Sequence, residues 1–314
     1  MNEHAFLKEQ SVGTQFSGVY YVSAVSVKKA KNNNEYTEFT LKDKSGSVFA
    51  KLWSVDPLIK KGMYVSTVVN VDDYMGAASF IIRSIKEYDK EVKQENYVAV
   101  VDDINSLIEQ FDEYARILKE TSEENKLPLS NIFDAVFTKE FKDKFFKSPS
   151  GLGNYYGKVG GALENTVNIC KGAMNFAGIY GFSSVDKAVL LTSALLSLIG
   201  SVDAYAMNDC AVEKTIKGEL FGPAFLSASI LNDAWKSVKK SEDDEIWFTK
   251  VYHAVTSNEG SGNIPLTKES ILLKNVIMID SKMSEMFDYI YRDEHIENGF
   301  TTFDPNGKRR YFVG

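Results

Sequence analysis

Aromatic and basic residues alternate along one short stretch of the chain, and this spacing suits the binding of single-stranded nucleic acid. Phe49, Lys51 and Trp53 occupy every second position between residues 48 and 53. In an extended strand every second side chain points to the same face, so these three lie together while the residues between them face the interior. Rings of this kind stack on bases, and ammonium groups meet phosphates.

A neighbouring segment extends the same surface. Residues 36–42 also alternate, so Phe39 and Leu41 face inward while Tyr36 and Lys42 face outward. Three lysines, Lys28, Lys29 and Lys31, lie in the preceding loop at the rim of this surface, where their charge can meet phosphates. Alternatively, the rings pack against a neighbouring domain or subunit and the lysines are merely solvated. The predicted nucleic-acid-binding residues are Lys28, Lys29, Lys31, Tyr36, Lys42, Phe49, Lys51, Trp53 and Arg83.

Other residues capable of chemistry are scattered. The three histidines, His4, His253 and His295, are far apart in sequence, and each is interpreted as structural. Glu164 could in principle act as a general base. The chain lacks a glycine-rich loop followed by Lys and Ser or Thr, so no nucleotide-binding motif is present.

Two segments in the middle of the chain carry a recognisable layout. Residues 154–166 read Asn-Tyr-Tyr-Gly-Lys-Val-Gly-Gly-Ala-Leu-Glu-Asn-Thr, and residues 194–202 read Ala-Leu-Leu-Ser-Leu-Ile-Gly-Ser-Val. The layout resembles the HD phosphohydrolase domain of the YhaM-like exoribonucleases. In that family the segments read roughly Asn-His-His-x-x-x-Gly-Gly-Leu-Leu-Glu-His-Thr and Leu-Leu-His-Asp-Ile-Gly-Lys.

The family's metal ligands are missing from this chain. Tyr155 and Tyr156 stand where the family has paired histidines, Asn165 replaces a ligand His, and Ser197 and Leu198 replace the His-Asp pair. A two-metal phosphodiesterase needs imidazole and carboxylate ligands, which these side chains cannot replace.

The loss continues downstream. Pro223 stands at a further ligand position, Asn258 and Glu259 replace two more histidines, and only Asp280 matches a ligand. The resemblance therefore implies a degenerate site with no catalytic residue, no metal and no cofactor. The cleft at this site, relined with Tyr, Asn and Ser, could hold nucleic acid or could have closed and packed.

The first third of the chain has the pattern of a small β-barrel. Five short runs of alternating or β-branched residues, with a longer interruption after the third, favour an OB fold, although other small barrels share the pattern. Residues 41–46 and 50–53 also resemble the OB domain of the YhaM-like family, which narrows the choice. The predicted strands are 18–27, 36–42, 48–53, 63–71 and 79–85.

From Val101 onward the apolar residues recur at helical spacing. The predicted class is α+β, with a five-stranded OB barrel followed by an all-helical, degenerate HD-like domain. We divide the chain into an OB domain (1–90), a helical connector (91–153) and the HD-like domain with a C-terminal tail (154–314). The predicted helices are a first one near residue 104, then 129–136, 139–146, 161–178, 184–200, 221–240, 245–258 and 268–291.

Composition and charge set the broad class. The net charge is −7, but residues 1–90 hold 12 Lys and Arg against 10 Asp and Glu, a local +2. Positive charge concentrated in the barrel is compatible with nucleic-acid binding, despite the negative net charge of the chain. Cys170 and Cys210 lie in apolar contexts and are expected to pack rather than pair. No run of about 18 apolar residues and no secretion signal is visible, which favours a cytoplasmic protein and no membrane partner.

The leading hypothesis is a non-enzymatic single-stranded nucleic-acid-binding protein, with DNA weakly favoured over RNA. The architecture is similar to that of phage single-stranded DNA-binding proteins of the Drc type, which implies the host cytoplasm and a partner in transcription (RNA polymerase) or replication. Apolar segments 188–199 and 271–286 favour a homo-oligomer. The alternatives are an active metal-dependent 3′–5′ exonuclease, and a structural, partner-binding paralogue that binds no nucleic acid.

Overall fold

The chain forms two compact units, which are described separately. The computed structural model describes residues 4–30, 32–152, 156–208, 211–238, 241, 244–257, 263–293 and 295–314. One unit comprises Met1–Ala99 with Asn208–Ala211, and the other comprises Val100–Met207 with Val212–Gly314. The predicted connector, 91–153, is thus divided: its residues up to Ala99 belong to the first unit and those from Val100 belong to the second.

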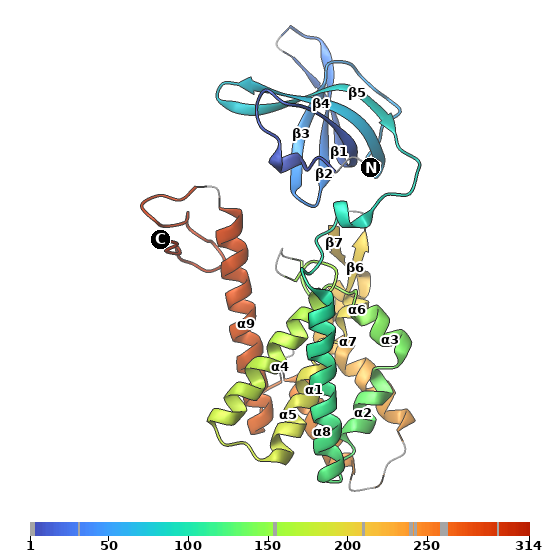
Figure 1. Ribbon diagram of the computed structural model, residues 1–314, viewed down its shortest axis with the longest axis vertical. Coiled ribbons are helices and arrows are strands. Elements are labelled where there is room, and N and C mark those ends of the chain that lie inside the picture. Colours follow the sequence, from blue (N-terminus) through green and yellow to red (C-terminus); the bar gives the residue numbers. More distant parts are fainter. Residues whose placement is uncertain are drawn as a thin grey trace. The chain divides into compact units, whose positions relative to one another are not determined.

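The first unit is a closed five-stranded barrel (Figure 1). Its strands follow the order β1-β2-β3-β5-β4 and close through the β1–β4 pair; the β3–β5 pair is parallel and the others are antiparallel. This topology fits an OB fold, so the predicted fold class is confirmed for this unit. The strands are β1 (Gln15–Lys29), β2 (Glu35–Asp43), β3 (Gly46–Leu52), β4 (Tyr64–Tyr74) and β5 (Ala77–Glu87).

A tight turn joins β4 to β5. Tyr74 pairs with Ala77 across a loop of two residues, Met75 and Gly76, which both have positive φ values (56° and 81°). Positive φ at both central residues is the signature of a type I′ turn, whose twist matches that of the flanking strands. The turn therefore holds the Tyr74 end of β4 in a defined position.

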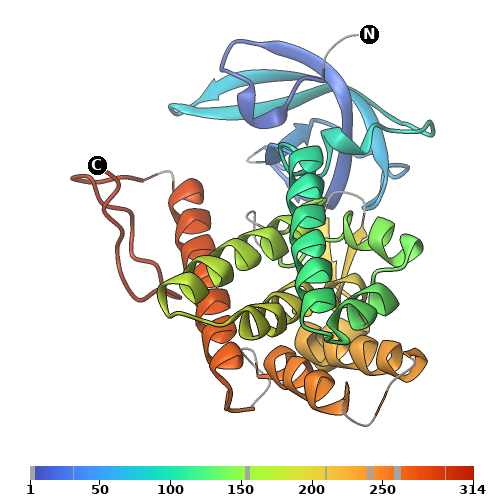
Figure 2. The ribbon, with the colours of Figure 1, turned by 60° about the horizontal axis from the view of Figure 1, so that its bottom comes forward.

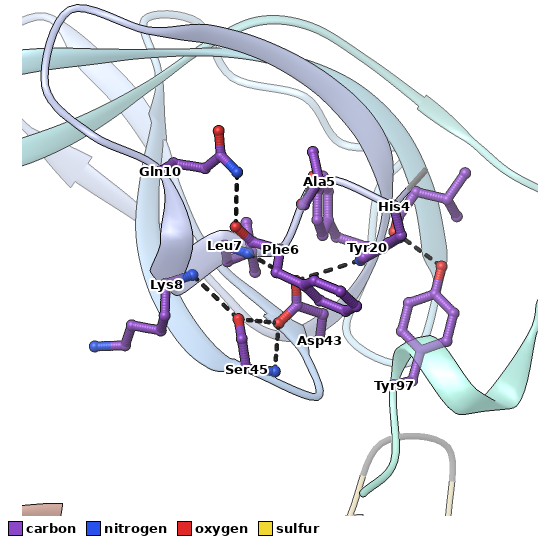
Figure 3. A network of polar contacts seen from close by, with 11 residues as sticks. His4, Ala5, Phe6, Leu7, Lys8, Gln10, Tyr20, Asp43, Ser45 and Tyr97 are labelled. Carbon is purple, nitrogen blue, oxygen red and sulfur yellow. Dashed lines mark hydrogen bonds and ion pairs between the residues drawn. The ribbon is translucent and has the colours of Figure 1, made fainter. Parts of the chain in front are cut away.

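The buried carboxylate of Asp43 ties the N-terminal segment to the barrel (Figure 3). It accepts hydrogen bonds from the Leu7 N–H at 2.8 Å, from the Ser45 N–H at 2.8 Å and from the Ser45 hydroxyl at 2.5 Å, and the His4 ring lies 3.3 Å away. The hydroxyl of buried Tyr20 donates to the Ala5 carbonyl at 2.6 Å. Since a buried carboxylate must be hydrogen-bonded, Asp43 fixes both the β2–β3 turn and the chain that precedes β1.

The second unit is a helical bundle with a single apolar core (Figure 2). Phenylalanines 111, 133, 137, 145 and 146 from the first three helices pack into the same core as the central helices, which joins residues 104–145 to the rest. The helices are α1 (Ile104–Glu124), α2 (Leu129–Val136), α3 (Lys139–Phe145), α4 (Gly161–Ile179), α5 (Ser184–Leu196), α6 (Ser201–Ala204), α7 (Ile216–Ser237), α8 (Asp244–Thr256) and α9 (Lys268–Arg292).

The prediction of an all-helical second unit was wrong in one place. A two-stranded sheet, β6 (Tyr205–Asn208) and β7 (Ala211–Lys214), lies between α6 and α7. The connection between these helices is long enough that its backbone groups need partners, and pairing two short strands supplies them.

The bounds of two helices also differ from prediction. The helix predicted at 184–200 ends at Leu196, and α6 follows as a separate turn. The helix predicted from Phe221 begins at Ile216, because the Thr215 side chain caps it by accepting the Gly218 N–H at 2.9 Å. It is kinked at Gly222 (φ 74°), directly before Pro223, which cannot donate a backbone hydrogen bond.

The segment from Ser184 to Ala204 is the one described helical stretch long and apolar enough to cross a membrane by length and composition. Most of it is buried inside the unit, as expected for a core helix. Residues 188–199 therefore cannot supply an intermolecular surface, and this part of the argument for a homo-oligomer was wrong. Burial of Cys170 raises the pKa of its thiol, and Cys210 lies outside the described residues.

Candidate nucleic-acid interface

The outward face of β2 and β3 carries large exposed rings. Phe49 is 67% exposed and Trp53 is 60% exposed, while Val48 and Ala50 on either side of Phe49 are buried. On β2, Phe39 and Leu41 are buried and the alternate residues are not. The predicted assignment of faces along both strands is therefore correct.

The register between the two strands orders this face. Phe49 lies opposite Thr40, and Lys51 lies opposite Glu38. Trp53 comes directly after β3, and its ring centroid is 5.2 Å from that of Tyr36 with an interplanar angle of 47°. Two rings thus form a tilted pair at one end of the face, and Phe49 stands alone toward the other end.

Tyr74 belongs to this surface and was missed by the sequence analysis. The ammonium of Lys51 lies 5.6 Å from the centroid of the Tyr74 ring, which is 59% exposed. A cation over an aromatic face is attracted by the ring quadrupole. The signal available in the sequence was an aromatic residue immediately before the Met75-Gly76 turn, but nothing local indicates that this hairpin end reaches Lys51.

The rim lysines differ from one another. Lys28 lies on β1, where its ammonium pairs with the Glu38 carboxylate at 2.5 Å, and this hydrogen bond raises the pKa of Lys28. Lys29 is exposed at the end of β1, opposite Glu35. Lys31 lies outside the described residues. Glu38 therefore offsets part of the positive charge that the sequence analysis assigned to the rim.

The two remaining predicted residues lie apart from the ring pair. Lys42 is half-buried on β2, opposite Ser47. Arg83 is exposed on β5, where the Asn70 amide, with its oxygen turned toward the guanidinium, accepts from Nε at 3.1 Å and Nη2 at 3.0 Å. The structure thus brings Tyr36, Lys51 and Trp53 onto one face with Tyr74, and it does not link Arg83 to them.

The second unit brings together the positions that the sequence resemblance equated with metal ligands. They line one cavity of about 370 Å³. Close backbone packing builds this site: a Cβ added to Gly161 would lie 2.1 Å from the Tyr156 carbonyl oxygen, and one added to Gly200 would lie 2.2 Å from that of Pro223. The equated residues on the cavity wall are Tyr156, Asn165, Ser197, Leu198, Pro223 and Asp280, while Tyr155, Asn258 and Glu259 lie outside the described residues.

Several of these side chains form hydrogen bonds with one another or with neighbouring residues. The Tyr156 hydroxyl donates to the Asp280 carboxylate, 2.9 Å from each oxygen, and accepts from the Asn168 amide at 3.1 Å. The Asn165 amide donates to the Ser150 hydroxyl at 3.1 Å. A phenol thus donates to the one carboxylate that the sequence resemblance equated with a metal ligand.

The cavity is acidic, which disfavours a phosphate. Burial, together with the nearby charge of Glu164, raises the pKa of Asp280 even though the Tyr156 hydrogen bond lowers it. Glu285 and Asp288 also line the wall, and the lining described contains no Lys or Arg. Like charges repel at short range, so the strand-binding role considered for this cleft has no electrostatic support.

The remaining candidates for chemistry have structural contacts. Glu164 Oε2 lies 2.8 Å from the Lys158 ammonium, so its carboxylate is ion-paired. His253 Nε2 accepts the Leu266 N–H at 2.9 Å, and His4 lies against Asp43. Among the residues that the structure describes, no group of three or more His, Cys, Asp or Glu side chains could hold a metal ion.

Comparison with known proteins adds little. No family model matches the chain. A solution structure of the second OB-fold domain of replication protein A from Methanococcus maripaludis is similar at 17% identity over 29% of this chain and 100% of that one, with a TM-score of 0.23. A score this low carries no argument, and the assignment of the barrel rests on its own strand order.

Proposed function

We propose that this protein is a non-enzymatic single-stranded nucleic-acid-binding protein whose barrel holds the strand. The observation that carries the proposal is the face of β2 and β3. Trp53 and Phe49 are more than half exposed there, and Lys51 and Tyr74 flank them. Exposed rings on a barrel face give successive bases a surface for stacking, which tolerates any sequence because every base has a π-face.

The distribution of charge on this face points to stacking as the larger contribution. Lys28 is paired with Glu38, and Glu38 also lies opposite Lys51 in the strand register. Only part of the local positive charge is available to phosphates, so the dependence of affinity on salt should be shallow. Each phosphate contact on a single strand contributes a slope of about 0.7 in log K against log salt.

The non-enzymatic part of the proposal rests on the cavity of the second unit. Its wall offers a phenol, an amide, a hydroxyl and carboxylates where a two-metal phosphodiesterase would need imidazoles as well. The sequence resemblance to the YhaM-like exoribonucleases and the architectural likeness to phage proteins of the Drc type support a binding protein that acts in phage transcription or replication. For the same reason we propose that the bound strand is DNA rather than RNA, and that the protein acts in the host cytoplasm.

Assembly into a homo-oligomer is part of the proposal. Ile279, Met283, Phe287 and Tyr291 follow one another at intervals of four along α9, and each is at least 42% exposed. Residues four apart lie on one side of a helix, so they form an apolar stripe. A second copy of the chain covering this stripe would let several barrels hold one strand with gained avidity.

The test is a fluorescence-anisotropy titration of the full chain with labelled single-stranded DNA, single-stranded RNA and duplex DNA at two salt concentrations. We expect both single strands to bind more tightly than the duplex, with a shallow salt slope. Indifference to all three would favour a structural, partner-binding protein. Shortening of a 3′-labelled strand that a chelator stops would favour the exonuclease.

A further inference from the structure

The C-terminal residues 295–314 form an ordered hairpin in the second unit, which we call the tail hairpin. Asp304 N–H donates to the Arg309 carbonyl at 2.8 Å, Thr301 N–H to the Tyr311 carbonyl at 2.9 Å, and Val313 N–H to the Gly299 carbonyl at 2.8 Å. Figures 1 and 2 both show this segment folding back beside the last turns of α9. These paired backbone groups give the segment a defined shape.

Polar anchors fix the tail hairpin to α9. The Thr302 N–H donates to the Asp293 carboxylate at 2.6 Å, and the hydroxyls of Thr302 and Tyr289 lie 2.8 Å apart. Buried Asp304 accepts from the Tyr311 hydroxyl at 3.0 Å. With its polar groups used internally, the hairpin holds its outward side chains in fixed places.

Those outward side chains are rings. Phe303 is 59% exposed and Phe312 is 68% exposed. The Phe312 ring packs against that of Phe300 with centroids 5.1 Å apart, and it lies so close to Gly299 that a Cβ there would be 2.8 Å from the ring. Gly299 also has a positive φ of 76°, so the backbone is shaped to seat this ring.

The rings are accompanied by three consecutive cations, Lys308, Arg309 and Arg310, all exposed. Arg310 donates to the Thr301 carbonyl at 2.7 Å and lies 5.5 Å from the centroid of the Phe300 ring, and Arg309 donates to the Gly307 carbonyl at 2.8 Å. These partners are neutral. Within the described residues, none of the three charges has a carboxylate at ion-pair distance, whereas Lys268, Lys217 and Lys142 elsewhere in the unit do.

We infer that the tail hairpin is a second binding surface for the same nucleic-acid strand. Rings on a fixed hairpin with guanidinium groups held by neutral carbonyls are the parts that hold bases and phosphates. The same combination, a ring pair with a cation over a ring, forms the barrel face, although the two surfaces share no sequence pattern. The inference rests on the proposed function and deepens it.

The distribution of charge on the tail hairpin indicates which side faces the bases and which side faces the phosphates. Phe303 and Arg310 line a cavity of about 490 Å³ together with Glu297. The Glu297 carboxylate would repel a phosphate, so a base occupies this side, where a carboxylate can accept from an exocyclic amino group. The phosphates then lie along the outer turn, at Lys308 and Arg309.

The test uses a tail variant of the full chain that combines Phe303→Ala, Lys308→Asn and Arg309→Gln. Asn suits position 308 because its φ is positive (53°), a conformation that Asn tolerates. A control matched in charge combines Phe225→Ala, Lys171→Gln and Lys147→Gln; Phe225 is a ring of the same unit with the same exposed fraction, 59%, and both lysines are exposed. Each is titrated against a 10-nucleotide and a 40-nucleotide single strand, beside the wild type and Trp53→Ala.

We expect the tail variant to bind the 40-nucleotide strand roughly fivefold or more weakly than the control does. Its salt slope should fall by about 0.7 for each phosphate that the variant no longer binds. Independently, a 40-nucleotide strand carrying 4-thiothymidine should photo-crosslink to the 295–314 peptide of the wild-type chain as well as to a barrel peptide. This measurement needs no variant.

The outcomes separate the two proposals. If Trp53→Ala weakens binding while the tail variant binds like the control and crosslinks appear on the barrel alone, the tail inference is refuted and the proposed function stands. If Trp53→Ala leaves binding to both strands unchanged, the barrel proposal fails, and crosslinks confined to residues 295–314 would then move the binding site to the tail.

Discussion

Replacement of Trp53 by alanine tests the barrel face most directly. The Trp53 ring is 60% exposed and 5.2 Å from that of Tyr36, so its removal takes away a stacking surface and little of the core. One base–aromatic stack contributes about 1–3 kcal/mol, which corresponds to a roughly 5- to 150-fold loss of affinity. The salt slope should hardly change, because no charge is removed.

The fluorescence of Trp53 itself can report strand binding. Trp235 is 3% exposed and Trp247 packs against the helical core, so Trp53 is the tryptophan that a bound strand can reach on the barrel face. A strand that stacks there should quench the intrinsic fluorescence of the wild type and leave that of Trp53→Ala nearly unquenched. Leu58→Ala is the matched control, since Leu58 is an apolar barrel residue that is 76% exposed.

Removing charge should change the salt dependence of binding, whereas removing the stacking ring should not. Replacing Lys29 and Lys51 by alanine should flatten the salt slope by about 0.7 for each phosphate that these lysines bind. The thermal midpoint of Trp53→Ala should lie within a few degrees of the wild type, because a ring pair contributes roughly 0.5–1.5 kcal/mol. A folded Trp53→Ala protein with undiminished affinity and unchanged quenching would refute a binding site on this face.

Four further outcomes are expected. Glu38→Gln should tighten binding by about two- to fivefold at low salt and steepen the salt slope, since it releases Lys28 from its ion pair; an unchanged slope would mean that Lys28 meets no phosphate. Elemental analysis should find no stoichiometric transition metal, and 3′-labelled RNA should stay intact with added manganese; about two metals per chain would overturn the pseudoenzyme proposal. Asp280→Asn should raise the thermal midpoint at pH 7: burial raises the pKa of Asp280, so its stabilising contribution is present at low pH and lost as pH rises through the folded-state pKa. The gain should therefore shrink as the pH falls toward 4, and a variant less stable than the wild type at pH 7 would contradict this. Light scattering at micromolar concentration should give a mass above that of one chain, and Met283→Ser with Phe287→Ser, which breaks the apolar stripe of α9, should lower it; a monomeric wild type would refute assembly.

Two aspartates show that residues of the same type can have very different surroundings in the folded protein. Asp43 and Asp280 are both carboxylates in motif-like segments, yet Asp43 is surrounded by donors and braces a turn, while Asp280 faces a cavity with other acidic groups. Local sequence indicates the turn at Asp43, because Ser45 two residues later supplies two of its donors, but it does not indicate the distant partners of either carboxylate. Their neighbours come from residues 36 and 124 positions away along the chain.

The sequence by itself determined most of the elements and their faces, although not the β6–β7 pair. Alternation with period two placed Phe49 and Trp53 outward and Val48 and Ala50 inward, and helical spacing predicted α2 at its observed bounds, because the interval between side chains on one face is a local property of the backbone. Only the tertiary structure decided which of these side chains meet. The pairing of Lys28 with Glu38, the approach of Tyr74 to Lys51, the acidic wall around Asp280 and the uncompensated arginines of the tail hairpin all depend on strand register, turn geometry or packing between distant segments. Contacts and ion pairs between distant segments exist only in the folded surface, so the periodicity that predicted exposure along a strand could not have revealed them.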